Sequence, residues 1–366
     1  MLTFEGCNFF RQRLVLSTLS GKAIKIIHIR DKDEQPGLTE YEANFLRLLD
    51  MLTDGSRIEV NESGTVLYYK PGVLVGGNTI HDCNMSRSMG YYLEPIIMLA
   101  PFMMKPISIT LKGITNGPSD PSVDYYRMCV LPRLKIFLPD ESLSLKILER
   151  GFHPEGVGKV TFTCPVVKKM PPVVLEDCGR IKRIRGIVYT SRVSPSIANR
   201  IIEAARGLLN KVVPDVYIYT DLAKKKESKS SPGYGVTLVA ESTTGTFLGA
   251  EVMFCKDGKD VVLPEDLGQQ AATLLFQEIL SGGCCDSVMQ VITMLFMAMG
   301  EKNVSKIKIG NLTDYSIQCL RHMRDLFQVT YKVDSKQEEI EETLTRQDVT
   351  LTCVGVGYAN YTKGIL

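Results

Sequence analysis

Four short segments of this chain share one pattern, an alternation of apolar and polar residues that in three of them ends at or next to a glycine. A period of two predicts β-strands with one buried face. Between these segments, apolar residues recur every three or four positions, as in amphipathic helices. Strands that alternate with helices are typical of layered folds, so we predict an α+β (layered α/β) fold. The four segments are Lys22–Arg30, Lys105–Gly113, Leu143–Gly151 and Val304–Gly310.

Two regions carry helical periodicity clearly. Behind the Pro36–Gly37 turn, one apolar stripe predicts a helix that reaches Leu52. Near the end of the chain, we predict an apolar helix over Ser287–Met299 and a second helix over Ser316–Phe327, followed by strands near Val329–Val333 and Thr350–Val356. The residues of the first stripe are Leu38, Tyr41, Phe45, Leu48, Leu49 and Leu52.

The stretch from about 185 to 283 reads as a separate module. Ser194–Pro195 predicts a helix start, because a hydroxyl side chain caps the first turn and proline suits the first helical position. Leu263–Pro264 predicts a second helix, which Gly282–Gly283 ends. Three strands complete this module, at Gly186–Tyr189, Asp215–Thr220 and Gly235–Glu241. We therefore predict a large domain over 1–184 and 284–366, interrupted by a small α/β domain over 185–283.

Composition narrows the class of protein. At 366 residues, with 44% hydrophobic and 23% charged residues, the chain suits a globular protein with a large core. Its net charge of +2 gives no overall nucleic-acid signal. Two local basic runs, Arg180–Arg185 and Lys224–Lys226 with Lys229, are either binding sites or solvated surface.

Cysteine usage and the apolar runs exclude several classes. The ten cysteines include no C-x-x-C pair and no zinc spacing, and Cys284–Cys285 is expected to be buried rather than redox-active. We expect a reducing compartment, no membrane association, no metal and no cofactor. The N-terminus lacks the regions of a signal peptide, and Pro95–Met104 and Val291–Met299 are too short to span a bilayer.

Six glycine- and proline-containing signatures occur along the chain: QPGL at 35–38, YYKPGVLVGG at 68–77, LKGITN at 111–116, PSVDYY at 121–126, RGFHPEGVG at 150–158 and SPGYG at 231–235. In this order they resemble the RNA 3′-terminal phosphate cyclase family over roughly residues 4–360. The resemblance implies three βαβαββ-type repeats with a small α/β insert before the last one. Segments 6–21, 183–201 and 231–235 are most similar to the eukaryotic branch that acts in ribosome biogenesis.

The departures from that family fall on its chemistry. Cyclases form a covalent histidine–AMP intermediate, and their L-H-T-x-T-like segment reads Leu312–Ser316 here, which leaves Tyr315 nearest the vacated nucleophile position. A glycine-rich stretch beside the nucleotide becomes Gly6-Cys7-Asn8-Phe9, which limits close approach to phosphates. The family's Q-H pair reads Tyr41-Glu42 and its D-Q pair reads Asp286-Ser287. The sequence therefore predicts that cyclase activity is lost.

Two candidate sites follow from the resemblance and from helical spacing. Five arginines match or neighbour family positions that face the former active site and are candidates for an RNA or anion groove, whereas the nearby glycines are better explained by turns. On the Ser316–Phe327 helix, a buried stripe of Ile317, Leu320, Met323 and Phe327 leaves Arg321 and Arg324 projecting together, either toward a partner or paired with Asp325. The five groove candidates are Arg11, Arg13, Arg30, Arg87 and Arg150.

The resemblance implies a non-catalytic factor in early nucleolar pre-rRNA processing for the small ribosomal subunit. Its implied partners are a large ribosome-assembly GTPase, the small-subunit processome and pre-rRNA, in the nucleus and nucleolus. A pre-rRNA endonuclease is the alternative, with Arg321, His322, Arg324 and Asp325 as its candidate residues. An active cyclase is the third reading, which the absent histidine opposes.

Overall fold

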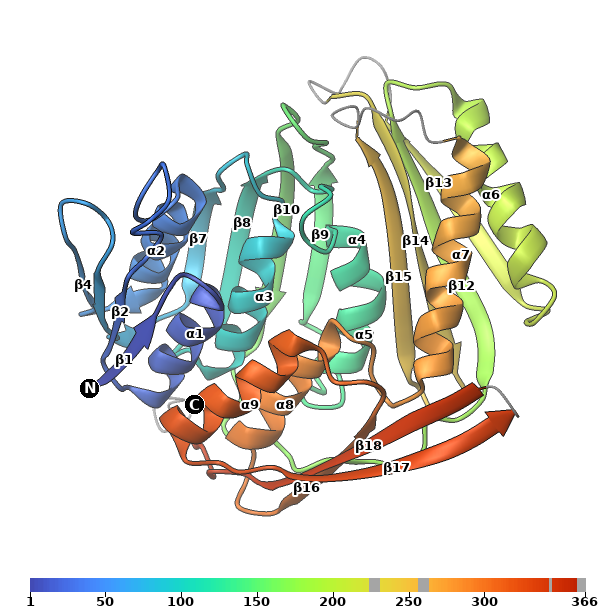
Figure 1. Cartoon of the computed structure of the whole chain (residues 1–366). Helices are drawn as coiled ribbons and strands as arrows, with labels where there is room; N and C mark the ends of the chain where they lie inside the picture. Colours follow the sequence, from blue (N-terminus) through green and yellow to red (C-terminus); the bar gives the residue numbers. More distant parts are fainter. Residues whose placement is uncertain (224–230, 256–262, 342–343, 361–366) are drawn as a thin grey trace.

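The strands of the chain gather into mixed sheets, and helices lie against them (Figure 1). The computed structural model describes residues 1–223, 231–255, 263–341 and 344–360. Within those residues there are four sheets of four strands and one pair of two-residue strands, β3 (Thr53–Asp54) and β6 (Val73–Leu74). The predicted mixed α/β class is therefore confirmed.

Three of the sheets share one strand order. In each, the first two strands are parallel and are separated in the chain by at least one helix, and the next two join antiparallel in the order first, second, fourth, third. The first sheet contains β1 (Leu2–Glu5), β2 (Ile24–Ile27), β4 (Arg57–Val60) and β5 (Leu67–Lys70). The second contains β7 (Gly77–Asp82), β8 (Ile107–Gly113), β9 (Ser144–Glu149) and β10 (Gly158–Cys164). The third contains β11 (Val174–Leu175), β16 (Val304–Ile309), β17 (Lys332–Glu341) and β18 (Leu344–Val354).

Helices join these strands and meet between the sheets. The predicted helix behind Pro36–Gly37 is confirmed, with Phe45, Leu48, Leu49 and Leu52 buried. The last two strands are longer than predicted, and the first of them begins at Lys332 rather than at Val329. The helices are α1 (Phe10–Ser20), α2 (Glu40–Leu52), α3 (Gly90–Leu99), α4 (Val123–Tyr125), α5 (Leu131–Leu134), α8 (Met289–Met299) and α9 (Asp314–Phe327).

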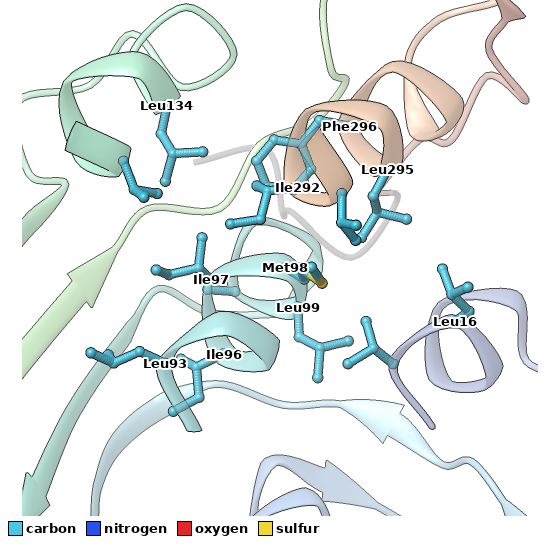
Figure 2. Packing of buried hydrophobic residues seen from close by; sticks show 14 of the residues in the cluster. Leu16, Leu93, Ile96, Ile97, Met98, Leu99, Leu134, Ile292, Leu295 and Phe296 are labelled. Carbon is cyan, nitrogen blue, oxygen red and sulfur yellow. The ribbon is translucent and has the colours of Figure 1, made fainter. Parts of the chain in front are cut away.

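The main core lies where α1, α3, α5 and α8 converge (Figure 2). Every residue of α3 and of α8 is buried, which agrees with helices that are apolar on nearly all sides. Each fully buried leucine, isoleucine or phenylalanine here contributes about 1.5–3 kcal/mol of hydrophobic free energy. The labelled side chains that interdigitate include Leu16, Leu99, Leu134, Leu295 and Phe296.

A fourth sheet, in the order β13-β12-β14-β15, has a second core of its own. Helices α6 (Pro195–Leu209) and α7 (Pro264–Ser281) cover one face of it (Figure 1). Ser194 accepts a bond from the Ser196 amide, and Gly282 ends α7 with φ 70°, so both predicted helix boundaries are confirmed. The strands are β12 (Ile181–Ser191), β13 (Val216–Ala223), β14 (Gly233–Ser242) and β15 (Phe247–Cys255), and the prediction missed β15.

The other face of the fourth sheet contacts the second sheet's helices. Gly249 on β15 lies so close to the Tyr125 ring that an added Cβ would meet it at 2.5 Å. Phe152, Ile187 and Tyr189 form a small apolar cluster across the same contact. A glycine is therefore required where this sheet approaches α4.

Cys284 and Cys285 are buried, as predicted. Lys224–Lys226 and Lys229 lie outside the described residues. Among the described helices, none combines the length and apolarity that crossing a bilayer requires.

Candidate functional site

A cavity of about 340 Å³ lies where the first and second sheets' helices meet the start of α9. It is walled by the loop after β1, by Arg30 and Arg87 in the segments that precede α2 and α3, and by the first turns of α1, α2, α3 and α9. Three of the five groove arginines and the vacated nucleophile position meet here. The lining residues are Cys7, Asn8, Phe9, Phe10, Arg11, Arg30, Tyr41, Glu42, Arg87, Tyr91 and Tyr315.

The loop after β1 carries the altered glycine stretch. Gly6 keeps a left-handed backbone at φ 69°, and Phe9 adopts φ 58° directly before α1, a conformation that a residue with a side chain seldom takes. The Phe9 ring stacks on the Tyr315 ring, with centroids 6.0 Å apart and planes inclined by 29°. An aromatic pair therefore occupies the wall where the resemblance implies a glycine-rich stretch.

Tyr315 is positioned by the cap of α9. The Thr313 hydroxyl accepts a bond from the Ser316 amide at 3.1 Å, which fixes the first turn. Burial raises the pKa of the Tyr315 phenol well above its usual value, and the Glu94 carboxylate raises it further. The phenol therefore stays protonated at neutral pH, and none of the described residues lining the cavity is a histidine. The residues present do not fit histidine–AMP chemistry.

Each of the three arginines at the cavity is paired with a carboxylate. Arg11 lies 2.9 Å from Glu94 and donates to the Tyr91 carbonyl at 2.7 Å. Arg30 makes a two-pronged contact with Glu42 at 2.7 Å for both bonds. Arg87 binds Asp120 in the same way, at 2.8 and 2.5 Å. Three cations therefore face three anions, and the cavity is close to electrically neutral.

The same carboxylates keep these arginines charged. Burial alone would lower the pKa of Arg11, but Glu94, together with Tyr315, Tyr91 and Asp120, more than offsets it and raises that pKa. Glu42 also accepts a bond from the Thr39 amide at 2.9 Å, so one carboxylate caps α2 and holds Arg30. Glu42 stands at the position of the histidine in the family's Q-H pair. Here it is the structural partner of Arg30.

The other two groove candidates lie elsewhere. Arg13 is buried and donates to the carbonyls of Glu5 and Gly6, at 3.2 and 2.7 Å. Arg150 is also buried, and it joins Asp124, at 2.6 and 3.0 Å, to Asp221 on β13, at 2.7 Å. Arg13 thus braces the loop after β1, and Arg150 ties the second sheet to the fourth. The structure brings together three of the five.

His322 lies on the inner side of α9 and does not line the cavity, although its ring packs edge-on against Phe9, which does. It is buried, and its Nδ1 lies 2.6 Å from the Gln12 side-chain oxygen. Burial, helped by the nearby Arg13 charge, lowers the pKa of His322 to about 4. The imidazole is therefore neutral at physiological pH and serves in packing and hydrogen bonding.

The outer side of α9 carries Arg321 and Arg324, both exposed. Arg324 contacts Asp325 at 3.3 Å, and Arg321 donates to the Gln318 side chain at 3.2 Å. Of the predicted stripe, Met323 is buried, Leu320 and Phe327 are half-buried and pack against the main core, and Ile317 is half-buried. The fully buried side also includes polar residues that hydrogen-bond inside the protein. Its residues are Ser316, Cys319, His322, Met323 and Leu326.

Asp286, which corresponds to the acid of the family's D-Q pair, is fully inside the protein. Its carboxylate accepts bonds from the Tyr125 hydroxyl, from the Gly249 amide at 3.0 Å and from the Met289 amide at 2.9 Å. These partners come from α4, β15 and the start of α8. The acid therefore fastens the fourth sheet to the main core.

The comparisons with known proteins agree with this geometry. The family model for RNA 3′-terminal phosphate cyclase matches residues 2–333, and the chain belongs to that family. It is 53% identical over 364 residues to the mouse RNA 3′-terminal phosphate cyclase-like protein, covering 99% of this chain and 97% of the relative, and 52% identical to the human one at the same coverage. The fission-yeast rRNA processing protein rcl1 is 42% identical over 366 residues, covering 99% of this chain and 98% of that protein.

The carboxylates that pair the arginines were missed from the sequence as functional partners. Glu94 carried one signal, since it is the sole acid in an otherwise apolar helix, and a buried acid requires a cation or hydrogen bonds. Asp120 gave no such signal, because an aspartate between Pro118 and Pro121 is typical of an ordinary turn. Among the described residues, no group of three or more histidine, cysteine, aspartate or glutamate side chains is placed to hold a metal ion.

Proposed function

We propose that this protein is a non-catalytic factor in early pre-rRNA processing for the small ribosomal subunit. It acts in the nucleolus, as part of the small-subunit processome and in complex with a ribosome-assembly GTPase. The fission-yeast relative is named as an rRNA processing protein, which supports this role. The state of the cavity supports the absence of cyclase chemistry.

One observation carries the proposal: Tyr315 stands in the cavity among arginines that are already paired. Adenylyl transfer in the cyclases needs an imidazole nucleophile. A buried phenol with a raised pKa is a poor substitute, because almost none of it is ionised at neutral pH. An incoming phosphate would also have to displace Glu42, Glu94 and Asp120 from their guanidinium partners.

The outer side of α9 suits a partner rather than a reaction. Arg321 and Arg324 offer two planar guanidinium groups with weak local partners, and such groups bind carboxylates or phosphates in a two-pronged manner. We propose that this side binds the GTPase. The endonuclease alternative needs His322 beside these arginines, but His322 faces the protein interior, so we favour the binding role.

We also propose that the chain is built from repeats. Residues 1–184 and 284–366 would form one large domain of three βαβαββ-type repeats, and residues 185–283 an inserted domain. The shared strand order of three sheets and the separate core of the fourth support this division.

The test is a pull-down of the tagged protein from cells, with identification of bound proteins and sequencing of bound RNA. The wild type is expected to carry pre-rRNA and an assembly GTPase, and Arg321→Ala with Arg324→Ala is expected to lose the GTPase. Arg57→Ala, an exposed arginine of the first sheet, is the matched control. Recovery of short RNAs with 3′-phosphate ends and no GTPase would overturn the proposal.

A further inference from the structure

Outside the cavity, exposed aromatic side chains gather on β13, the edge strand of the fourth sheet. Tyr217 is 63% exposed and Tyr219 is 38% exposed, although most tyrosines of this chain are buried or half-buried. The two residues are separated by one position, so their side chains leave the same face of the strand, about 6.7 Å apart along it.

The register identifies which face this is. Tyr217 pairs with Arg185, and Tyr219 pairs with Ile187, on the neighbouring strand β12. Ile187 belongs to the apolar cluster that faces the second sheet, whereas α6 and α7 cover the opposite face. The β15 side of this same face is occupied, since Gly249 meets Tyr125 and the Glu251 carboxylate accepts bonds from Ser122. The β13 side holds the exposed rings.

Basic side chains border these rings. Arg185 binds Asp215 at 2.8 and 2.9 Å, and Arg183, two residues earlier on β12, binds Glu241 at 2.6 Å. The Arg185 and Asp215 side chains are 33% and 53% exposed, so water screens this pair and a phosphate can compete with the carboxylate for the guanidinium.

We infer that Tyr217 and Tyr219, with Arg185 and Arg183 beside them, form a binding platform for single-stranded RNA. Exposed aromatic rings on a sheet surface stack on unpaired bases, and neighbouring arginines bind the backbone. The platform extends the proposed rRNA-processing role by naming a place where RNA would bind, and its biological meaning rests on that role.

The exposed rings favour RNA over an added strand from a protein partner. Strand addition to β13 would use the backbone hydrogen bonds of its free edge and would not need the faces of the rings. Base stacking uses the faces of the Tyr217 and Tyr219 rings. Removing the rings should therefore weaken RNA binding but should not prevent a protein strand from pairing with β13.

The experiment measures binding of the full chain to a fluorescein-labelled single-stranded oligouridine by fluorescence anisotropy. Tyr217→Ala and Tyr219→Ala are each expected to weaken binding about tenfold, and Tyr217→Phe with Tyr219→Phe to keep it, because phenylalanine retains the ring. Arg185→Gln is expected to reduce the slope of log affinity against log salt by about 1.

Tyr68→Ala is the matched control, because Tyr68 is a half-exposed tyrosine beside Arg57 on the first sheet. It is expected to leave affinity unchanged, and circular dichroism checks that every variant is folded. Wild-type affinity in the folded Tyr217→Ala/Tyr219→Ala variant, or no binding by the wild type, would overturn the inference. The inference would also be overturned if this variant lost a protein partner in a pull-down from cells but kept its affinity for the oligouridine. Pre-rRNA processing in cells is scored separately, so failure of the platform and failure of the proposed function are distinguishable.

Discussion

The arginines near the two sides of helix α9 differ in how closely they are paired. The inner side presents Tyr315 to a cavity in which Arg11, Arg30 and Arg87 each lie within 2.9 Å of a carboxylate. The outer side presents Arg321 and Arg324, whose polar contacts are longer, at 3.2 and 3.3 Å, and exposed.

This difference follows from desolvation. A guanidinium that is taken out of water needs a fixed partner, so the arginines at the cavity are held by carboxylates of the protein. An exposed guanidinium keeps its hydration and can exchange a weak partner for a stronger one. A former active site can therefore keep its arginines as structural ion pairs after its nucleophile is gone, while binding moves to exposed groups.

The largest expected effect concerns the most buried arginine pair. Asp124→Ala removes the two-pronged partner of Arg150, whose side chain is 6% exposed, and leaves that charge with Asp221 and a long contact to the Asn116 side-chain oxygen at 3.5 Å. We expect a loss of about 3–5 kcal/mol in the free energy of unfolding, measured by urea denaturation. Glu59→Ala, which breaks the exposed Arg57 pair, is the control and is expected to cost well under 1 kcal/mol. Equal losses would refute the distinction between buried and exposed pairs.

A smaller effect is expected at the cavity. Glu42→Gln removes the charge that holds Arg30, so we expect about 2 kcal/mol of destabilisation. The released guanidinium should then bind anions, and sulfate should raise the melting temperature of this variant more than that of the wild type. An equal sulfate response in both proteins would show that the pairing with Glu42 does not exclude anions.

Glu251 tests what happens to a carboxylate without an arginine partner, because its hydrogen bonds come from Ser122 and Thr237. Burial raises the pKa of Glu251 to about 7, from an ordinary value of 4.5. The protonated carboxyl stabilises the fold below pH 4.5, and this contribution is lost as pH rises through 7, by up to about 1.4 kcal/mol per pH unit.

The measurement compares urea midpoints of the wild type and Glu251→Gln between pH 5 and pH 8. His322 acts in the opposite direction, since its lowered pKa makes the fold less stable as pH falls below 6.5. The difference between the two proteins isolates Glu251, and it should shift in favour of Glu251→Gln as pH rises. A difference that is constant across this range would contradict the raised pKa.

The smallest expected effect on stability is at the outer side of α9. Arg321→Ala with Arg324→Ala should change the free energy of unfolding by no more than about 0.5 kcal/mol, because both side chains are exposed. Thermal denaturation of the purified variant measures this. A loss of several kcal/mol would mean that these arginines support the fold and are not free for a partner.

The sequence predicted those elements whose two faces differ. Strand β8 alternates buried and half-buried residues along its whole length, so its sequence pattern predicted a strand. Strand β15 was missed because α7 covers one of its faces and the second sheet's helices cover the other, which removes the alternation. On α9 the prediction missed the polar part of the buried side, because Ser316 and His322 are polar residues with internal hydrogen bonds.

The candidate site was predictable only in part. The lost nucleophile and the arginine positions can be read from short motifs. Their partners cannot, since Glu94 lies 83 residues from Arg11 and Asp120 lies 33 residues from Arg87. Such pairs form only when the helices and loops of two sheets meet. The near-neutral charge of the cavity could therefore not be predicted from the sequence.

The most direct test asks which side of α9 the cell needs. Cells depleted of this protein would be supplied with the wild type, with Tyr315→Phe, or with Arg321→Ala/Arg324→Ala, and their pre-rRNA would be examined by northern blot. We predict normal processing with Tyr315→Phe and accumulation of unprocessed precursor with the arginine variant. Normal processing with the arginine variant and a block with Tyr315→Phe would show that the cavity still does chemistry, and would contradict this account.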